Sequence, residues 1–112
     1  MSVVNVRGLH DLKEWMTDPN NIYIGRKGVI VTDGRKFPSQ DSIWNNPFKL
    51  TREINRDESF ILYRKHLDDI LRNPDNISSL LSLHGKNLGC WCAEDMHHGH
   101  ILREYINHYN LN

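Results

Sequence analysis

The sequence predicts a small α/β protein: a single domain over residues 1–112, with a short mixed sheet and about three to four helices. Two observations lead to this class. Short runs of β-branched residues alternate with longer segments in which apolar residues recur every three or four positions. The length of 112 residues suits one domain built around one hydrophobic core. We therefore expect helices packed against a sheet.

The N-terminal half is predicted to hold a helix at residues 9–16 and strands at residues 3–6, 22–24 and 29–31. Pro19 ends the helix, because proline cannot continue it. Residues 32–35 read as a tight turn, so the strand before them is expected in an antiparallel edge hairpin. Residues 35–50 are rich in Pro, Asn and Ser, and we expect them to be irregular.

The C-terminal half is predicted to hold a strand at residues 87–91 and helices at residues 56–72, 77–83 and 96–109. Asn55 caps the first helix, with Glu58 at the capping-box position, and Pro74 ends it. Gly85 is the expected left-handed residue after the second helix, and Asp95 is the expected cap of the last. The strand feeds directly into the last helix, so we expect it inside the sheet.

Charge and cysteine content exclude several classes of protein. Lys and Arg balance Asp and Glu at 14 each, so no net field draws the chain to nucleic acid or to an acidic membrane. No apolar run approaches the ~18 residues of a membrane span, and the N-terminus does not resemble a signal peptide. The two cysteines are too close for an unstrained disulfide. We expect reduced thiols in a cytoplasmic protein.

The segment GKNLGCWCAEDMHHGHILREYI, residues 85–106, carries both cysteines and three of the seven histidines. Because strand side chains alternate, Cys90 and Cys92 are expected on one face and Trp91 on the other. His98 falls in the first turn of the last helix, beyond the carboxyl end of the strand, where open α/β sheets bind ligands. A helix N-terminus favours thiolate and neutral imidazole.

Three interpretations of this segment remain open. A zinc site would use Cys90, Cys92, His97 and His100, although their spacing is more compact than that of a zinc finger. A site without metal would use a cysteine as nucleophile and His98 as acid or base. In the third interpretation the cysteines are small core residues, and the histidines are solvated or cap the backbone.

Two further residues are candidates for ligand binding. Arg26 follows a predicted strand, and its guanidinium suits phosphate or carboxylate, although a surface ion pair is an alternative. Asn46 precedes Pro47, which forces it into an extended conformation that either aims the amide at a ligand or stabilises a turn. Trp44 and Phe48 are interpreted as core anchors.

The same segment resembles the C-terminal signature of domain-of-unknown-function family 4326, found in bacteria, phages and large DNA viruses. That signature is G-K-x-L-G-C-W-C-A-P, a short gap, then C-H-G and an apolar helix. The blocks VVN with Arg7, IYIGR and WNNPF resemble the family's opening strands and its W-G-N-P-F block. The resemblance spans almost the whole chain and implies shared polar residues at Asn5, Arg7, Arg26, Asn46, Cys90, Cys92 and His98.

Two departures from the family pattern bear on chemistry. His97 occupies the position of the family's second-motif cysteine, and Glu94 replaces its proline. A Cys-to-His exchange keeps metal-ligand chemistry but not nucleophile chemistry, so it favours metal binding or makes His97 dispensable. Residues 27–42 look like an insertion that could cover or alter a site.

The resemblance names no activity, so three hypotheses stand. The first is a module that binds a small anionic, nucleotide-like ligand or a metal, zinc being the possible cofactor, through the ligand-binding side chains Arg7, Arg26, Asn46 and His98. The second is a thiol- or zinc-dependent enzyme with Cys90, Cys92 and His98 as catalytic candidates. The third is a non-enzymatic interaction or virion protein, in the host cytoplasm or the virion if the source is viral.

Overall fold

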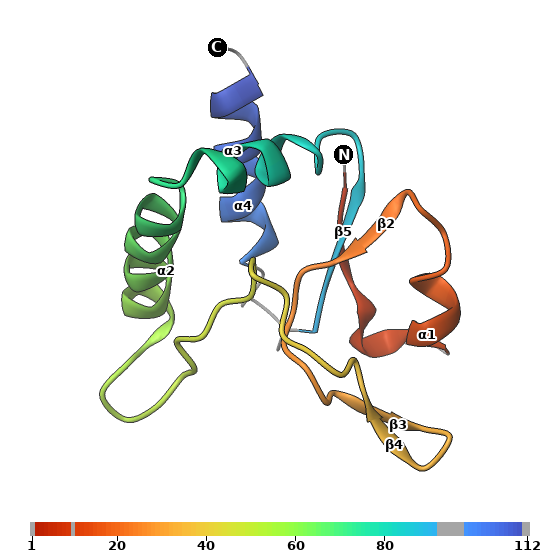
Figure 1. Ribbon diagram of the computed structural model, residues 1–112. Coiled ribbons are helices and arrows are strands. Elements are labelled where there is room, and N and C mark those ends of the chain that lie inside the picture. Colours follow the sequence, from red (N-terminus) through yellow and green to blue (C-terminus); the bar gives the residue numbers. More distant parts are fainter. Residues whose placement is uncertain (1, 10, 92–97, 111–112) are drawn as a thin grey trace.

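The α/β class is confirmed by a computed structural model, which describes residues 2–9, 11–91 and 98–110 (Figure 1). Its elements, in chain order, are β1 Val3–Asn5, the 3-10 helix η1 Val6–Gly8, α1 Leu12–Trp15, β2 Asn21–Tyr23, β3 Ile30–Thr32, β4 Arg35–Phe37, α2 Arg56–Ile70, α3 Pro74–Leu81, β5 Asn87–Cys90 and α4 Gly99–Asn110. None of these described helices is long and apolar enough to cross a membrane.

The main sheet has three parallel strands in the order β1-β5-β2. The strand predicted to lie inside the sheet, β5, is indeed its centre. Leu88 pairs with Val3 on one side and with Ile22 on the other. Because both neighbours run parallel to β5, all three strands end at the same edge of the sheet.

The predicted hairpin is also confirmed, as a separate two-stranded sheet that projects away from the main one (Figure 1). β3 and β4 pair antiparallel around Asp33 and Gly34, both at positive φ. The expectation that residues 35–50 are irregular throughout was wrong for β4. Its sequence Arg-Lys-Phe has little strand propensity, and it becomes a strand because the Asp-Gly turn brings it opposite β3.

Helix boundaries follow the capping residues. Asn55 accepts a hydrogen bond from the Glu58 N–H at 2.9 Å, which confirms the predicted start of α2. α3 begins at Pro74, three residues before the predicted start, because Asn73 caps it and proline suits the first helical turn.

The N-terminal helix is shorter than predicted. α1 begins at Leu12, where Asp11 accepts from the Glu14 N–H at 3.1 Å, whereas Leu9 lies outside it at the end of η1. The earlier start at residue 9 was therefore wrong. Asp95 and the predicted start of the last helix at residue 96 lie outside the described residues.

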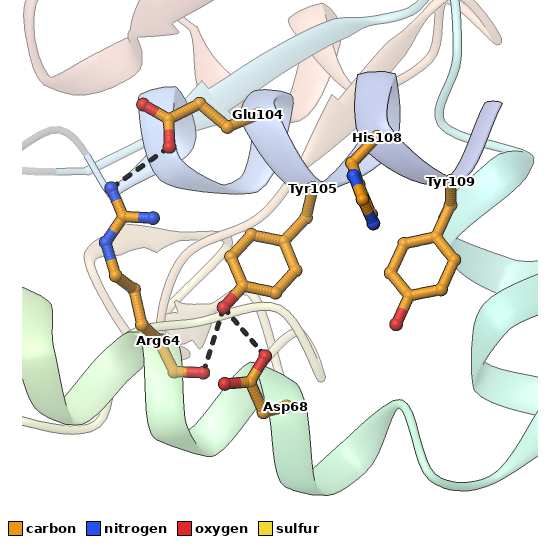
Figure 2. A pocket seen from close by; sticks show the side chains of 6 residues that line it. All are labelled: Arg64, Asp68, Glu104, Tyr105, His108 and Tyr109. Carbon is orange, nitrogen blue, oxygen red and sulfur yellow. Dashed lines mark hydrogen bonds and ion pairs between the residues drawn. The ribbon is translucent and has the colours of Figure 1, made fainter. Parts of the chain in front are cut away.

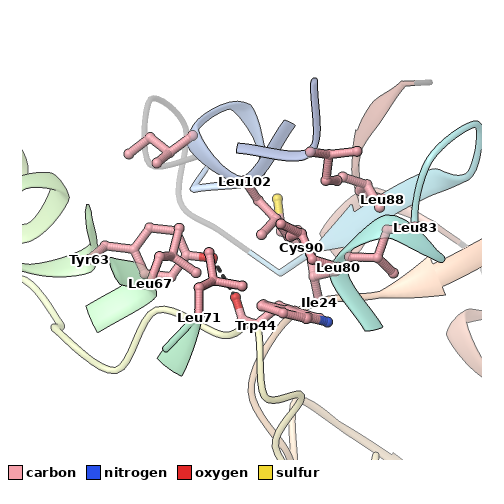
Figure 3. Packing of buried hydrophobic residues seen from close by; sticks show 12 residues of the cluster. Ile24, Trp44, Tyr63, Leu67, Leu71, Leu80, Leu83, Leu88, Cys90 and Leu102 are labelled. Atoms are coloured by element: carbon pink, nitrogen blue, oxygen red, sulfur yellow. Dashed lines mark hydrogen bonds between the residues drawn. The ribbon is translucent and has the colours of Figure 1, made fainter. Parts of the chain in front are cut away.

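Two apolar clusters form the core. The larger joins the main sheet to α2, α3 and α4, with Leu88 and Cys90 from β5 (Figure 3). The smaller is built on Val6, Leu12 and Tyr23, with Trp91 packed against it. Cys90 and Trp91 therefore lie on opposite sides of the strand, as the alternation of strand side chains predicts.

Candidate functional site

A groove of about 510 Å³ lies beyond the carboxyl ends of β2 and β5. One wall is the loop that follows β2, another is the segment before α2, and the residue after β5 completes it. Its lining is Arg26, Lys27, Gly28, Val29, Asp41, Asn45, Pro47, Lys49 and Trp91. This edge of a parallel sheet is where open α/β folds bind ligands.

Backbone contacts hold the loop that carries two of these cations. The Tyr23 hydroxyl donates to the Arg26 carbonyl at 2.7 Å. The Lys27 N–H donates to Asp41 Oδ1 at 2.8 Å, which ties the loop to the opposite wall. A Cβ at Gly25 would lie 2.6 Å from Tyr23 Cζ, so the ring packs directly on the glycine. The Arg26 and Lys27 side chains thus start from an anchored backbone.

The groove has an excess of positive charge. Arg26, Lys27 and Lys49 face a single carboxylate, Asp41. Within the described part of the chain, no ion pair joins these three cations to a carboxylate. Arg26 and Trp91 are half-buried, whereas the two lysines are exposed. The arrangement suits an anion, and the half-buried indole adds a flat apolar surface.

Asn46, predicted as a ligand-binding residue, lies outside the groove lining. Its Nδ2 donates to the Ser59 hydroxyl at 3.0 Å, and its Oδ1 accepts from the Phe48 N–H at 3.0 Å. Ser59 in turn donates to the Phe48 carbonyl at 2.6 Å, so the amide fastens this segment to α2. The neighbouring Asn45 lines the groove instead. Trp44 is buried, which confirms it as a core anchor.

The Cys/His motif is divided between the core and the surface. Cys90 is fully buried, and its sulfur lies within the packed apolar side chains of the larger cluster (Figure 3). His100 is exposed, with Nδ1 3.1 Å from an Arg103 guanidinium nitrogen. Cys92 and His97 lie outside the described residues. The described residues contain no cluster of three possible metal ligands, and the zinc site stays a prediction.

His98 joins the start of α4 to the end of β2. The side chain is buried, and its Nε2 lies 2.9 Å from the Ile24 carbonyl oxygen. A carbonyl oxygen only accepts, so this nitrogen carries the proton and donates. The ring packs edge-on against Tyr63, with 5.1 Å between centroids. A Cβ at Gly99 would lie 2.7 Å from Val3 Cγ1, so α4 begins in close contact with the sheet.

Arg7, the remaining predicted binding residue, is exposed in η1 and does not line the groove. The Asn5 side chain accepts from its backbone N–H at 3.1 Å. Of the predicted ligand-binding residues, the structure therefore brings only Arg26 to the groove. Lys27 and Lys49 were missed, although each lies next to a block that carries the family resemblance.

A second groove, of about 350 Å³, lies between α2 and α4 (Figure 2). Arg64 pairs with Glu104 across it at 3.0 Å. The Tyr105 hydroxyl approaches Asp68 Oδ1 at 2.8 Å and the Arg64 carbonyl at 3.2 Å. Burial, followed by the hydrogen bond to Asp68, raises the pKa of Tyr105 to about 12. These contacts tie the two helices together.

Comparison with known proteins gives one match. The model of a family described as Domain of unknown function (DUF4326) matches residues 8–108, a span that includes the whole groove and the Cys/His motif. No curated protein and no solved structure matches the chain. The family match confirms the resemblance in the three sequence blocks, and the chain belongs to the DUF4326 family.

Proposed function

We propose that the protein binds a small anionic, nucleotide-like ligand in the groove beyond β2 and β5. The observation that carries this proposal is the convergence of Arg26, Lys27 and Lys49 on one groove that holds a single carboxylate. That carboxylate, Asp41, already accepts the Lys27 backbone N–H. Three cations around so little negative charge favour an anionic occupant.

The shape and remaining lining of the groove favour a nucleotide over a bare anion. A volume of about 510 Å³ falls within the range of roughly 300–1,000 Å³ typical of small-molecule sites. Trp91 supplies an aromatic face, and stacking of one base on such a face contributes about 1–3 kcal/mol. Arg26 can bind two phosphate oxygens at once, whereas a lysine acts as a point charge.

Isothermal titration with AMP, ADP, ATP and inorganic pyrophosphate tests the proposal. Arg26→Ala should weaken binding at least tenfold and leave the fold intact, because the Tyr23 hydroxyl contacts the Arg26 carbonyl and not its side chain. Arg72→Ala is the matched control, since this exposed arginine lies outside the groove lining. Absence of heat with all four ligands, or equal affinity of the Arg26 variant, would remove the proposal.

A further inference from the structure

We infer that the nucleotide-like unit bound in this groove belongs to a single-stranded nucleic acid, whose neighbouring phosphates run along the hairpin β3–β4. The inference rests on the proposed function and names its partner. It starts from the hairpin, which projects from the main sheet and adjoins the groove (Figure 1).

The balanced charge of the whole chain conceals a basic segment. Residues 26–56 contain seven Lys or Arg and three Asp or Glu, although the complete chain carries 14 of each. This segment forms two walls of the groove and the whole hairpin. The absence of net charge therefore does not argue against a local polyanion site, because affinity for phosphates depends on the cations at the interface.

The cations of β4 lie beside the groove. A Cβ at Gly28, a lining residue, would be 3.7 Å from Lys36 Cδ, so the Lys36 side chain runs along the rim. Arg35 is exposed next to it on β4. Asp33, the acidic residue of the hairpin turn, lies 3.2 Å from Lys13 Nζ on α1. The described residues show no ion pair for Arg35 or Lys36.

The hairpin is long enough for more than one phosphate. A three-residue strand spans about 10 Å at roughly 3.4 Å per residue, which covers two or three phosphates at the per-strand spacing of about 3.4 Å. Val31, which is 71% exposed, lies directly opposite Lys36 on the same face of the hairpin. This face offers an apolar surface beside a cation.

The groove selects a single strand over a duplex. The Trp91 indole is half-buried in a groove of nucleotide size, so a base must leave its pair before it can reach the ring. Stacking on an aromatic ring combined with a basic track is the usual means of binding single strands without sequence preference.

Fluorescence anisotropy with a labelled oligothymidylate of twelve nucleotides, competed by thymidine monophosphate, tests the inference. The oligonucleotide should bind at least tenfold more tightly than the monophosphate. Arg35→Ala/Lys36→Ala should weaken oligonucleotide binding and reduce the log–log salt slope by about 1.4, at roughly 0.7 per phosphate, without changing monophosphate affinity. Arg35→Gln/Lys36→Gln, which keeps long polar side chains, should give the same result.

The control removes equal charge elsewhere: Lys65→Ala/Arg72→Ala, on α2 and just after it, should leave both affinities unchanged. Equal affinity for oligonucleotide and monophosphate, an unchanged salt slope in both hairpin variants, or equally tight binding of a duplex would overturn the inference while leaving the proposed function standing. If neither the monophosphate nor the oligonucleotide binds, both fail.

Discussion

Gly89→Ala tests whether the central strand needs its glycine. Gly89 lies in the middle of β5, where the face opposite Leu88 and Cys90 meets the N-terminal elements. A Cβ at this position would lie 2.7 Å from Val6 Cγ1 and 2.6 Å from Trp15 Cζ3. Ordinary contact between carbon atoms begins near 3.5 Å, so both neighbours must move by almost 1 Å.

The cost follows from overpacking a filled core. Forced insertion of one carbon costs typically about 1–3 kcal/mol. The variant also loses unfolded-state entropy, which returns roughly 0.4–1 kcal/mol to its stability. We therefore expect a net loss of about 1–2 kcal/mol, which corresponds to a fall in melting temperature of roughly 4–8 °C for a chain of this size.

Thermal and urea unfolding, followed by circular dichroism, measure this loss. Trp15→Leu removes the ring that the new methyl group would meet, so in that background Gly89→Ala should cost clearly less. A Gly89→Ala protein as stable as the parent would refute the reasoning. Equal cost in both backgrounds would show that the Trp15 ring is not the obstacle.

Three further predictions concern the core and the helix contacts. Ser59→Ala should lower the free energy of unfolding by about 1–3 kcal/mol in urea titrations, because the Asn46 amide loses its buried acceptor. In a Cys92→Ser chain, a thiol reagent should modify the fully buried Cys90 slowly, and faster in denaturant; rapid labelling of the folded protein would contradict its placement. Since the pKa of Tyr105 rises from 10.0 to about 12, stability from its neutral form should be complete below pH 10 and fall as the pH rises through 12; phenolate absorbance should show this high step in the parent and lose it in Tyr105→Phe.

The parts of the fold that the sequence predicts best are those decided by local signals. The start of α2 at its Asn55 cap and the left-handed Gly85 are each determined by a few adjacent residues. The central position of β5 follows from connection rules. β4 could not be predicted from its own residues, because only pairing with β3 makes it a strand.

The candidate site was less predictable because its walls come from distant segments. Arg26 could be identified, since it follows a strand that ends at the binding edge of a parallel sheet. Lys49 could not, because its place depends on how the segment before α2 folds back toward the loop after β2. Asn46 had two interpretations at the sequence level, and only the position of Ser59 on α2 shows which hydrogen bonds its amide makes.

The strand order has a consequence for biosynthesis. β1 and β2 do not pair with one another, and each finds its partner only in β5, near the end of the chain. On the ribosome, both early strands therefore emerge with unpaired backbone and wait until residues 87–90 have left the exit tunnel. The nascent chain exposes these apolar segments to chaperones through most of translation, and the sheet closes in one late step.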